Sequence, residues 1–215
     1  YRHPLSYDDC DTKPTTAAGQ TVYHNNTDTR ELFEGWPEKA NKRYAWYYSA
    51  SFYWYVCPLP ILEKLPEDFR YIADEGTLGI YAEGSSRKPN ETIYFEDLTG
   101  YLESRLIWDP YMSDAEYEQA LCEYLKVHYG SGWQAIREYI RMYHEAAYNA
   151  KCFITHFDWP KTMTYIPYYG EHYDEMRALF DEAIIKADTK EQAERIKLLS
   201  TSMEFLALCA QHKEQ

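Results

Sequence analysis

Two short runs of aromatic and β-branched residues, separated by a stretch with helical spacing, form the most informative pattern along the chain. The runs cover residues 44–52 and 78–82, and each leads into small and polar residues. The stretch between them begins near Pro58 and ends at Gly76. Its apolar positions recur at helical spacing: Leu62, Leu65, Phe69 and Ile72. This pattern predicts a strand–helix–strand unit whose two strands are parallel neighbours.

The second half of the chain shows helical periodicity only. A helix with an apolar stripe is predicted over residues 94–107 and is stopped by Asp109 and Pro110. Capping-box sequences then occur at 113–116 and 189–192, and we expect at least four helices after residue 110. We therefore divide the chain into an α/β part, residues 1–110, and a helical C-terminal subdomain, residues 111–215.

Aromatic residues are unusually frequent, with 23 Tyr and 6 Trp among 215 residues. Tyrosine and tryptophan combine a large apolar ring with a polar tip, which suits a surface that binds carbohydrate. A tyrosine-rich core is the alternative, and we favour it for most individual tyrosines.

Charge and cysteine content exclude several classes of function. The net charge is −13 and no basic cluster is present, so neither nucleic acid nor an anionic membrane is an expected partner. No apolar run approaches the roughly 18 residues of a membrane span. The five cysteines are scattered, no metal-ligand spacing or phosphate-binding loop occurs, and we expect neither a metal nor a cofactor. The chain begins at Tyr1 rather than methionine, so we expect upstream sequence, and neither a cytoplasmic nor an exported location is favoured.

A series of short motifs occurs in the same order as in a known protein family. They include Tyr-x-Trp-x-Tyr at 44–48, Pro-Leu-Pro-Ile-Leu at 58–62, Gly-Ile-Tyr-Ala-Glu-Gly at 79–84, Leu-Ile-Trp-Asp-Pro at 106–110 and Leu-Phe-Asp-Glu-Ala at 179–183. On these motifs the chain resembles the bacterial DUF4838 family, a glycoside-hydrolase-like group related in architecture to α-glucuronidases and hexosaminidases.

The resemblance implies a fold and a partner. It implies the C-terminal part of a (β/α)8 TIM-like barrel followed by a mainly α-helical extension. The remaining strands would lie in the upstream N-terminal part of the same protein, which is then a partner of this chain. It also implies that the protein hydrolyses or binds a complex polysaccharide.

This chain departs from the family pattern at two places. Family members often carry Asp and Asn where this chain has Tyr47 and Ser51. They often carry a glutamate one position earlier than Glu83. Because side chains alternate between the faces of a strand, this shift of one position changes the face that the carboxylate is expected to occupy.

The candidate site residues are those expected at the strand ends. Glu83 is the candidate catalytic carboxylate, and its alternative is a rim glutamate that binds a loop amide or a tyrosine. His3, Trp46, Tyr48 and Tyr81 are the candidate sugar-binding residues. Hydrolysis would use two carboxyl groups roughly 5 to 9 Å apart, one acting as acid and the other as base or nucleophile. A non-catalytic carbohydrate-binding or structural module that has lost the catalytic acids is the second hypothesis.

Overall fold

The computed structural model describes residues 32–52, 55–57, 59–84, 95–149 and 165–212. Residues 32–35 are helical and lead into a 3-10 turn. In chain order the elements are η1 (Trp36–Glu38), β1 (Tyr44–Tyr48), α2 (Leu65–Asp74), β2 (Gly79–Glu83), α3 (Glu96–Trp108), α4 (Asp114–Tyr129), η2 (Gly130–Gly132), α5 (Trp133–Asn149), α6 (Ile166–Glu171), α7 (Tyr173–Lys186) and α8 (Lys190–His212). The described residues form a mixed α/β fold that is mainly helical.

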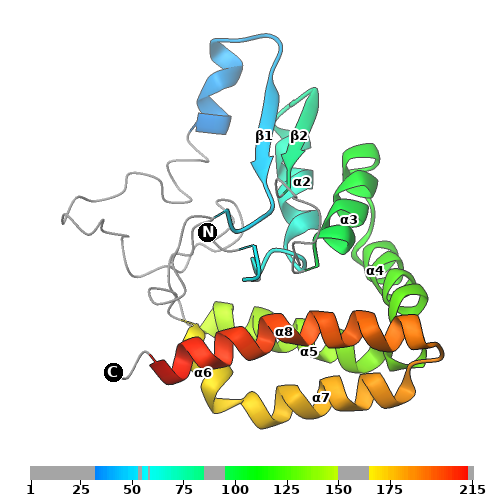
Figure 1. Ribbon diagram of the computed structural model, residues 1–215. Helices are drawn as coiled ribbons and strands as arrows, with labels where there is room; N and C mark the ends of the chain where they lie inside the picture. The colour runs from blue at the N-terminus through cyan, green and yellow to red at the C-terminus, as the bar shows by residue number, and fades with distance from the viewer. Residues whose placement is uncertain (1–31, 53–54, 58, 85–94, 150–164, 213–215) are drawn as a thin grey trace.

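The strands β1 and β2 pair in parallel, as the alternation of patterns predicts. Trp46 pairs with Tyr81, and Tyr48 pairs with Glu83. α2 connects the two strands, and they lie side by side in Figure 1. Tyr47 anchors the sheet to this helix: its ring lies 5.0 Å from that of Phe69, and its hydroxyl donates to the buried Asp68 over 3.1 Å.

The first strand is shorter than the sequence pattern predicts. The pattern extends it to residue 52, whereas β1 ends at Tyr48. The last ladder hydrogen bond runs from the backbone N–H of Ser49 to the carbonyl of Glu83 over 3.1 Å. Because β2 also ends at Glu83, the residues after Ser49 have no neighbouring strand in the described sheet.

The helix α2 begins later than the sequence pattern predicts. It starts at Leu65 rather than near Pro58, and residues 61–64 form turns. Pro66 explains the difference, because a proline fits the first turn of a helix but breaks a helix in whose interior it lies. The apolar positions predicted for this stretch are nonetheless all buried: Leu62, Leu65, Phe69 and Ile72.

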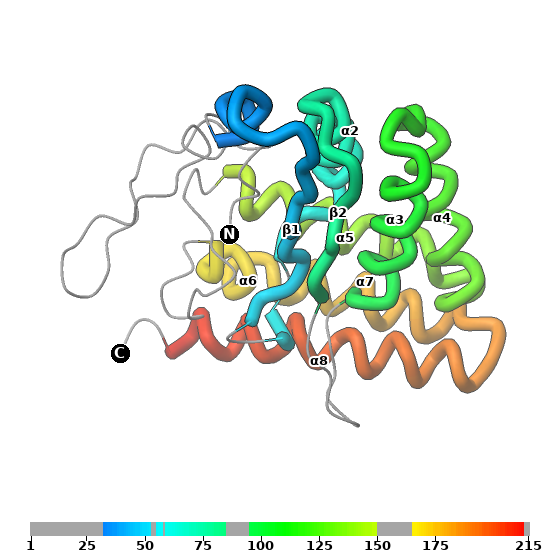
Figure 2. Tube along the Cα trace, turned by 90° about the horizontal axis from the view of Figure 1, so that it is seen from above, coloured from blue at the N-terminus to red at the C-terminus, as the bar shows by residue number. Residues whose placement is uncertain are grey.

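The helices α5 to α8 form a layer at the carboxyl ends of the strands, and α3 and α4 lead into it (Figures 1 and 2). The two predicted capping boxes are present. The Ser113 hydroxyl accepts from the N–H of Glu116, and the Thr189 hydroxyl accepts from the N–H of Gln192. Gly130 ends α4 with a positive φ of 58°, a conformation that favours glycine.

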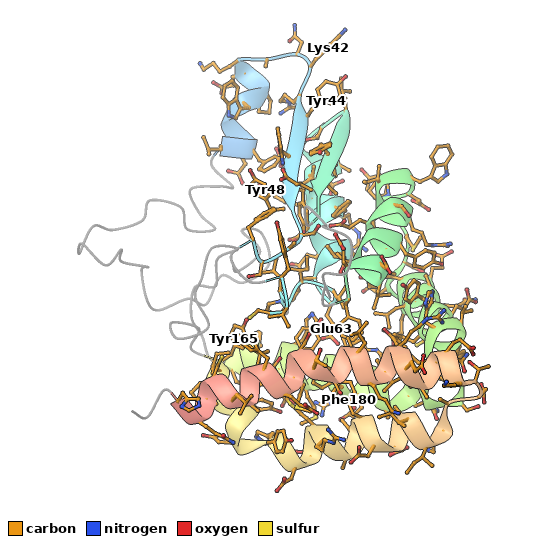
Figure 3. The ribbon with its side chains drawn as sticks, in the orientation of Figure 1. Lys42, Tyr44, Tyr48, Glu63, Tyr165 and Phe180 are labelled. Atoms are coloured by element: carbon orange, nitrogen blue, oxygen red, sulfur yellow. The ribbon has the colours of Figure 1, made fainter. Side chains whose placement is uncertain are left out.

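One core of buried apolar side chains continues from β1 to α8. The predicted stripe of α3 is part of it: Phe95, Leu98, Leu102 and Leu106. Tyr165 and Phe180 belong to the helical layer in Figure 3, and both are buried. The predicted division at residue 110 falls inside this continuous core and stays a prediction.

Many tyrosines belong to the core, which is the role that the sequence favours for most of them. The buried ones include Tyr47, Tyr117, Tyr129, Tyr139, Tyr143, Tyr165 and Tyr169. Cys57 is buried, and Cys122 and Cys209 are partly buried. Within the described segments, no helix combines the length and apolar character required to cross a membrane.

Candidate functional site

One face of the two-stranded sheet carries exposed aromatic rings. α2 covers the face that contains Tyr47, so the alternate residues point the other way. Trp46 is 65% exposed and Tyr81 is 60% exposed. Their ring centres lie 5.0 Å apart, and the Trp46 ring lies 6.3 Å from that of Tyr48. Figure 3 shows Tyr48 projecting from β1 away from α3. The sheet therefore brings together three of the four predicted sugar-binding residues.

Glu83 belongs to the same face. The indole N–H of Trp46 donates a hydrogen bond to Glu83 Oε2 over 2.7 Å. The shift of one position relative to the family pattern therefore leaves the Glu83 carboxylate beside the aromatic rings. Its partner is an indole, rather than the loop amide or tyrosine of the alternative interpretation. This bond fixes the orientation of the Trp46 ring, because indole has a single polar donor.

A groove adjoins Trp46 toward the N-terminal end of β1. It has a volume of about 420 Å³. Its aromatic lining consists of Phe33, Trp36, Tyr44 and Trp46, and Lys42 and Arg43 add cationic donors. Tyr44 is 74% exposed, so the aromatic surface extends along the whole length of β1.

The remaining candidate, His3, lies outside the described residues. Of the five predicted site residues, the structure thus places Trp46, Tyr48, Tyr81 and Glu83.

A separate cavity lies where the two strands end. It has a volume of about 170 Å³ and lies between residues 49–51 of the segment after β1, the first turns of α3, and Tyr143 of α5. A Cβ atom at Gly84 would lie 3.1 Å from Glu96 Oε1, so the end of β2 packs closely against the carboxylate of Glu96. The strand ends therefore border the cavity on the side away from the aromatic face.

Glu103 of α3 is the charged residue buried in this cavity, and sequence reasoning missed it. It is only 5% exposed. The pKa of its carboxyl group is raised to about 7. Burial raises it, and a hydrogen bond with the Ser49 side chain opposes this with a smaller effect. The sequence contained a signal for the burial of Glu103. Thr99, Glu103 and Leu106 follow one another at spacings of four and three, which places all three on the buried side of α3.

Metal binding has no support in this part of the chain. Among the described residues, no group of three or more His, Cys, Asp or Glu side chains could hold a metal ion. The aromatic face, the groove and the cavity offer aromatic rings, hydroxyls, carboxyl groups, the Cys57 thiol and the cationic groups of Lys42 and Arg43.

A comparison with protein-family models shows which family the chain belongs to. The model described as "Domain of unknown function (DUF4838)" matches residues 12–141. The chain belongs to the DUF4838 family. The match includes both strands, α3, α4 and the first half of α5, so it covers the aromatic face and the described cavity lining except Tyr143. No curated protein and no solved structure matches this DUF4838 chain significantly.

Proposed function

We propose that this DUF4838 chain binds a carbohydrate on its aromatic sheet face, as part of a glycoside-hydrolase-like protein. The observation that carries the proposal is the set of exposed rings on one strand face, with the Trp46 indole held by Glu83. Aromatic rings offer large contact area to the apolar face of a sugar ring and lose little conformational freedom on binding. The adjacent carboxylate can accept hydrogen bonds from sugar hydroxyls.

The position of α2 supports a barrel-like architecture. Crossover connections between parallel strands are right-handed, and in a (β/α)8 barrel the helices surround the strands. Because α2 packs on the Tyr47 face, the opposite face would point into the barrel, and only its part near the strand ends would stay open to a substrate. Tyr48 and Glu83, the last residues of β1 and β2, would then lie at the rim where barrel enzymes bind their substrates.

Hydrolysis of a polysaccharide is the second candidate function, and the position of Glu83 at a strand end favours it. A glycosidase needs two carboxyl groups flanking the scissile bond. Glu83 is the single carboxylate in the two strands. A second acid would therefore have to come from another segment or from the upstream part of the protein. The mechanism would need no cofactor.

The test compares two exposed tryptophans in oligosaccharide binding. Trp46→Ala should weaken binding at least about tenfold, because removal of the ring removes the stacking surface. Trp108→Ala is the matched control, since this side chain is 91% exposed and lies at the end of α3. Calorimetric titration of both variants against a panel of soluble oligosaccharides measures the difference.

Glu83→Gln separates binding from hydrolysis. The glutamine side-chain carbonyl can still accept from the Trp46 indole, so oligosaccharide binding should stay within about threefold of the original. Any turnover of the oligosaccharide should fall strongly, because an amide cannot act as acid, base or nucleophile. Unchanged binding in Trp46→Ala would refute the carbohydrate site, and unchanged turnover in Glu83→Gln would reduce Glu83 to a residue that orients the indole.

A further inference from the structure

The cavity at the strand ends contains two buried polar groups without hydrogen-bond partners among the described residues. They are Oε1 of Glu103 and the hydroxyl of Ser51, which is 2% exposed. A buried donor or acceptor without a partner costs about 1 to 3 kcal/mol. Neither atom is exposed to solvent, but both side chains line the same cavity, so rotation of the Ser51 hydroxyl and of the Glu103 carboxyl group would let one bound molecule satisfy both.

The lining indicates the chemistry of that molecule. Its described residues include the carboxyl groups of Glu96 and Glu103 and the rings of Tyr55, Phe95 and Tyr143, but no lysine, arginine or histidine. Carboxyl groups accept hydrogen bonds and repel anions, whereas aromatic rings favour the apolar face of a ring. A cavity of about 170 Å³ is smaller than the roughly 300 to 1,000 Å³ of pockets for drug-sized ligands, so it suits a single small ring.

We propose that this cavity is a binding site for one hydroxylated ring without an acidic group, such as a neutral sugar unit, which donates hydrogen bonds to Glu103 and Ser51. This cavity site is separate from the aromatic sheet face, and the proposal does not depend on carbohydrate binding at that face. Ser49 lies between the two regions, since its hydroxyl is within hydrogen-bonding reach of Glu103 and 3.3 Å from the carbonyl oxygen of Glu83, and its single proton can be donated to either. The burial that leaves Glu103 Oε1 without a partner also raises the pKa of this carboxyl group, and it does so in the ligand-free protein.

Ligand-observed NMR titrations with glucose and glucuronic acid test the proposal. Glucose should bind with a dissociation constant on the order of millimolar, as expected for so small a ligand. At pH 8, where Glu103 with its pKa of about 7 is mainly ionised, glucuronic acid should bind at least about tenfold more weakly, because its carboxylate meets Glu96 and Glu103. Equal affinity for the two sugars, or no saturable binding of glucose, would overturn the site.

Three variants localise the binding. Glu103→Leu should lower glucose affinity at least about tenfold, and Glu103→Gln should retain it within about threefold because the amide carbonyl still accepts. Ser51→Ala removes one hydroxyl from a buried position and should lower affinity about threefold. If Glu103→Leu fails to fold, the Ser51→Ala result decides, and an unchanged affinity there contradicts the proposal.

Trp46→Ala distinguishes this inference from the proposed function. It should leave glucose affinity in the cavity unchanged while oligosaccharide binding on the sheet face falls. Loss of oligosaccharide binding in Glu103→Leu together with unchanged glucose binding would contradict the cavity site. Failure of Trp46→Ala to alter oligosaccharide binding would contradict the sheet-face function and leave the glucose result standing.

Discussion

At the scale of single residues, the environment of each carboxyl group determines its role. Glu83 lies at a strand end, is half-buried and accepts from an indole, whereas Glu103 is enclosed between α3 and the strand ends. Both are glutamates on a short stretch of sequence, yet one can reach a large ligand and the other only a small one. The residue type does not reveal this difference in burial between Glu83 and Glu103, because burial depends on which elements pack around each side chain.

Glu103 should make the stability of the protein fall as pH rises. Its pKa is raised by burial from 4.5 to about 7, so the folded protein holds this proton more tightly than the unfolded chain. The stabilisation is present at low pH and is lost between about pH 4.5 and 7. Glu103→Gln should therefore raise the free energy of unfolding by roughly 3 kcal/mol above pH 7, at about 1.36 kcal/mol per pKa unit, and by little below pH 4.

His144 supplies an internal contrast for this measurement. Its Nδ1 contacts the carbonyl of Ile140 and its Nε2 accepts from the N–H of Glu63, which together fit a neutral ring. Burial lowers its pKa from 6.5 to about 3, so its contribution is present above pH 6.5 and is lost as pH falls. In the original protein the two slopes oppose each other between about pH 4.5 and 6.5. Urea denaturation across this range should show stability rising with pH in Glu103→Gln, and a flat profile in that variant would contradict the account.

At the scale of elements, close packing of η2 against α7 leaves no room for a side chain at Gly132. A Cβ atom there would lie 2.4 Å from the carbonyl oxygen of Ala183. Gly132→Ala should therefore lower the free energy of unfolding by about 1 to 3 kcal/mol, the usual cost of overpacking. Gly100→Ala is the matched control, because a Cβ at that position in α3 meets nothing within 4 Å. This control should instead stabilise by about 0.5 to 1 kcal/mol, and equal melting temperatures for both variants would contradict the packing of η2 on α7.

Local patterns predicted most of the elements. Parallel pairing of the strands, the stripe of α3, the capping boxes at Ser113 and Thr189, and the helix end at Gly130 all follow from periodicity or from one or two capping residues. The cause of the stripe, the capping boxes and the helix end is local, and the parallel pairing follows from the helix that connects the two strands.

Features that depend on distant segments escaped prediction. The strand pattern continues to residue 52, but β1 ends where its partner β2 ends. The burial of Glu103 and His144 depends on packing between elements that are far apart in sequence. The hydrogen bond from the Trp46 indole to Glu83 joins the two strands, so it depends on their register, which no single strand reveals.

At the scale of the whole molecule, the described sheet has two strands and each has one neighbour. Isolated two-stranded sheets have little stability of their own, and open edges with exposed rings promote association. We therefore predict that the isolated 215-residue chain self-associates. Light scattering over a range of concentrations measures this, and added oligosaccharide should reduce association by covering Trp46 and Tyr81. A monodisperse monomer with a cooperative melting transition would show instead that the chain is a self-sufficient domain.

The most direct test of the account follows the indole N–H signals of the six tryptophans by NMR while an oligosaccharide is added. The account predicts that the Trp46 signal shifts saturably, because its N–H is bound to Glu83 at the centre of the aromatic face. The Trp108 signal should not move, since that residue lies on α3 away from the sheet. Saturable binding that leaves the Trp46 signal unchanged would contradict the assignment of carbohydrate binding to this face.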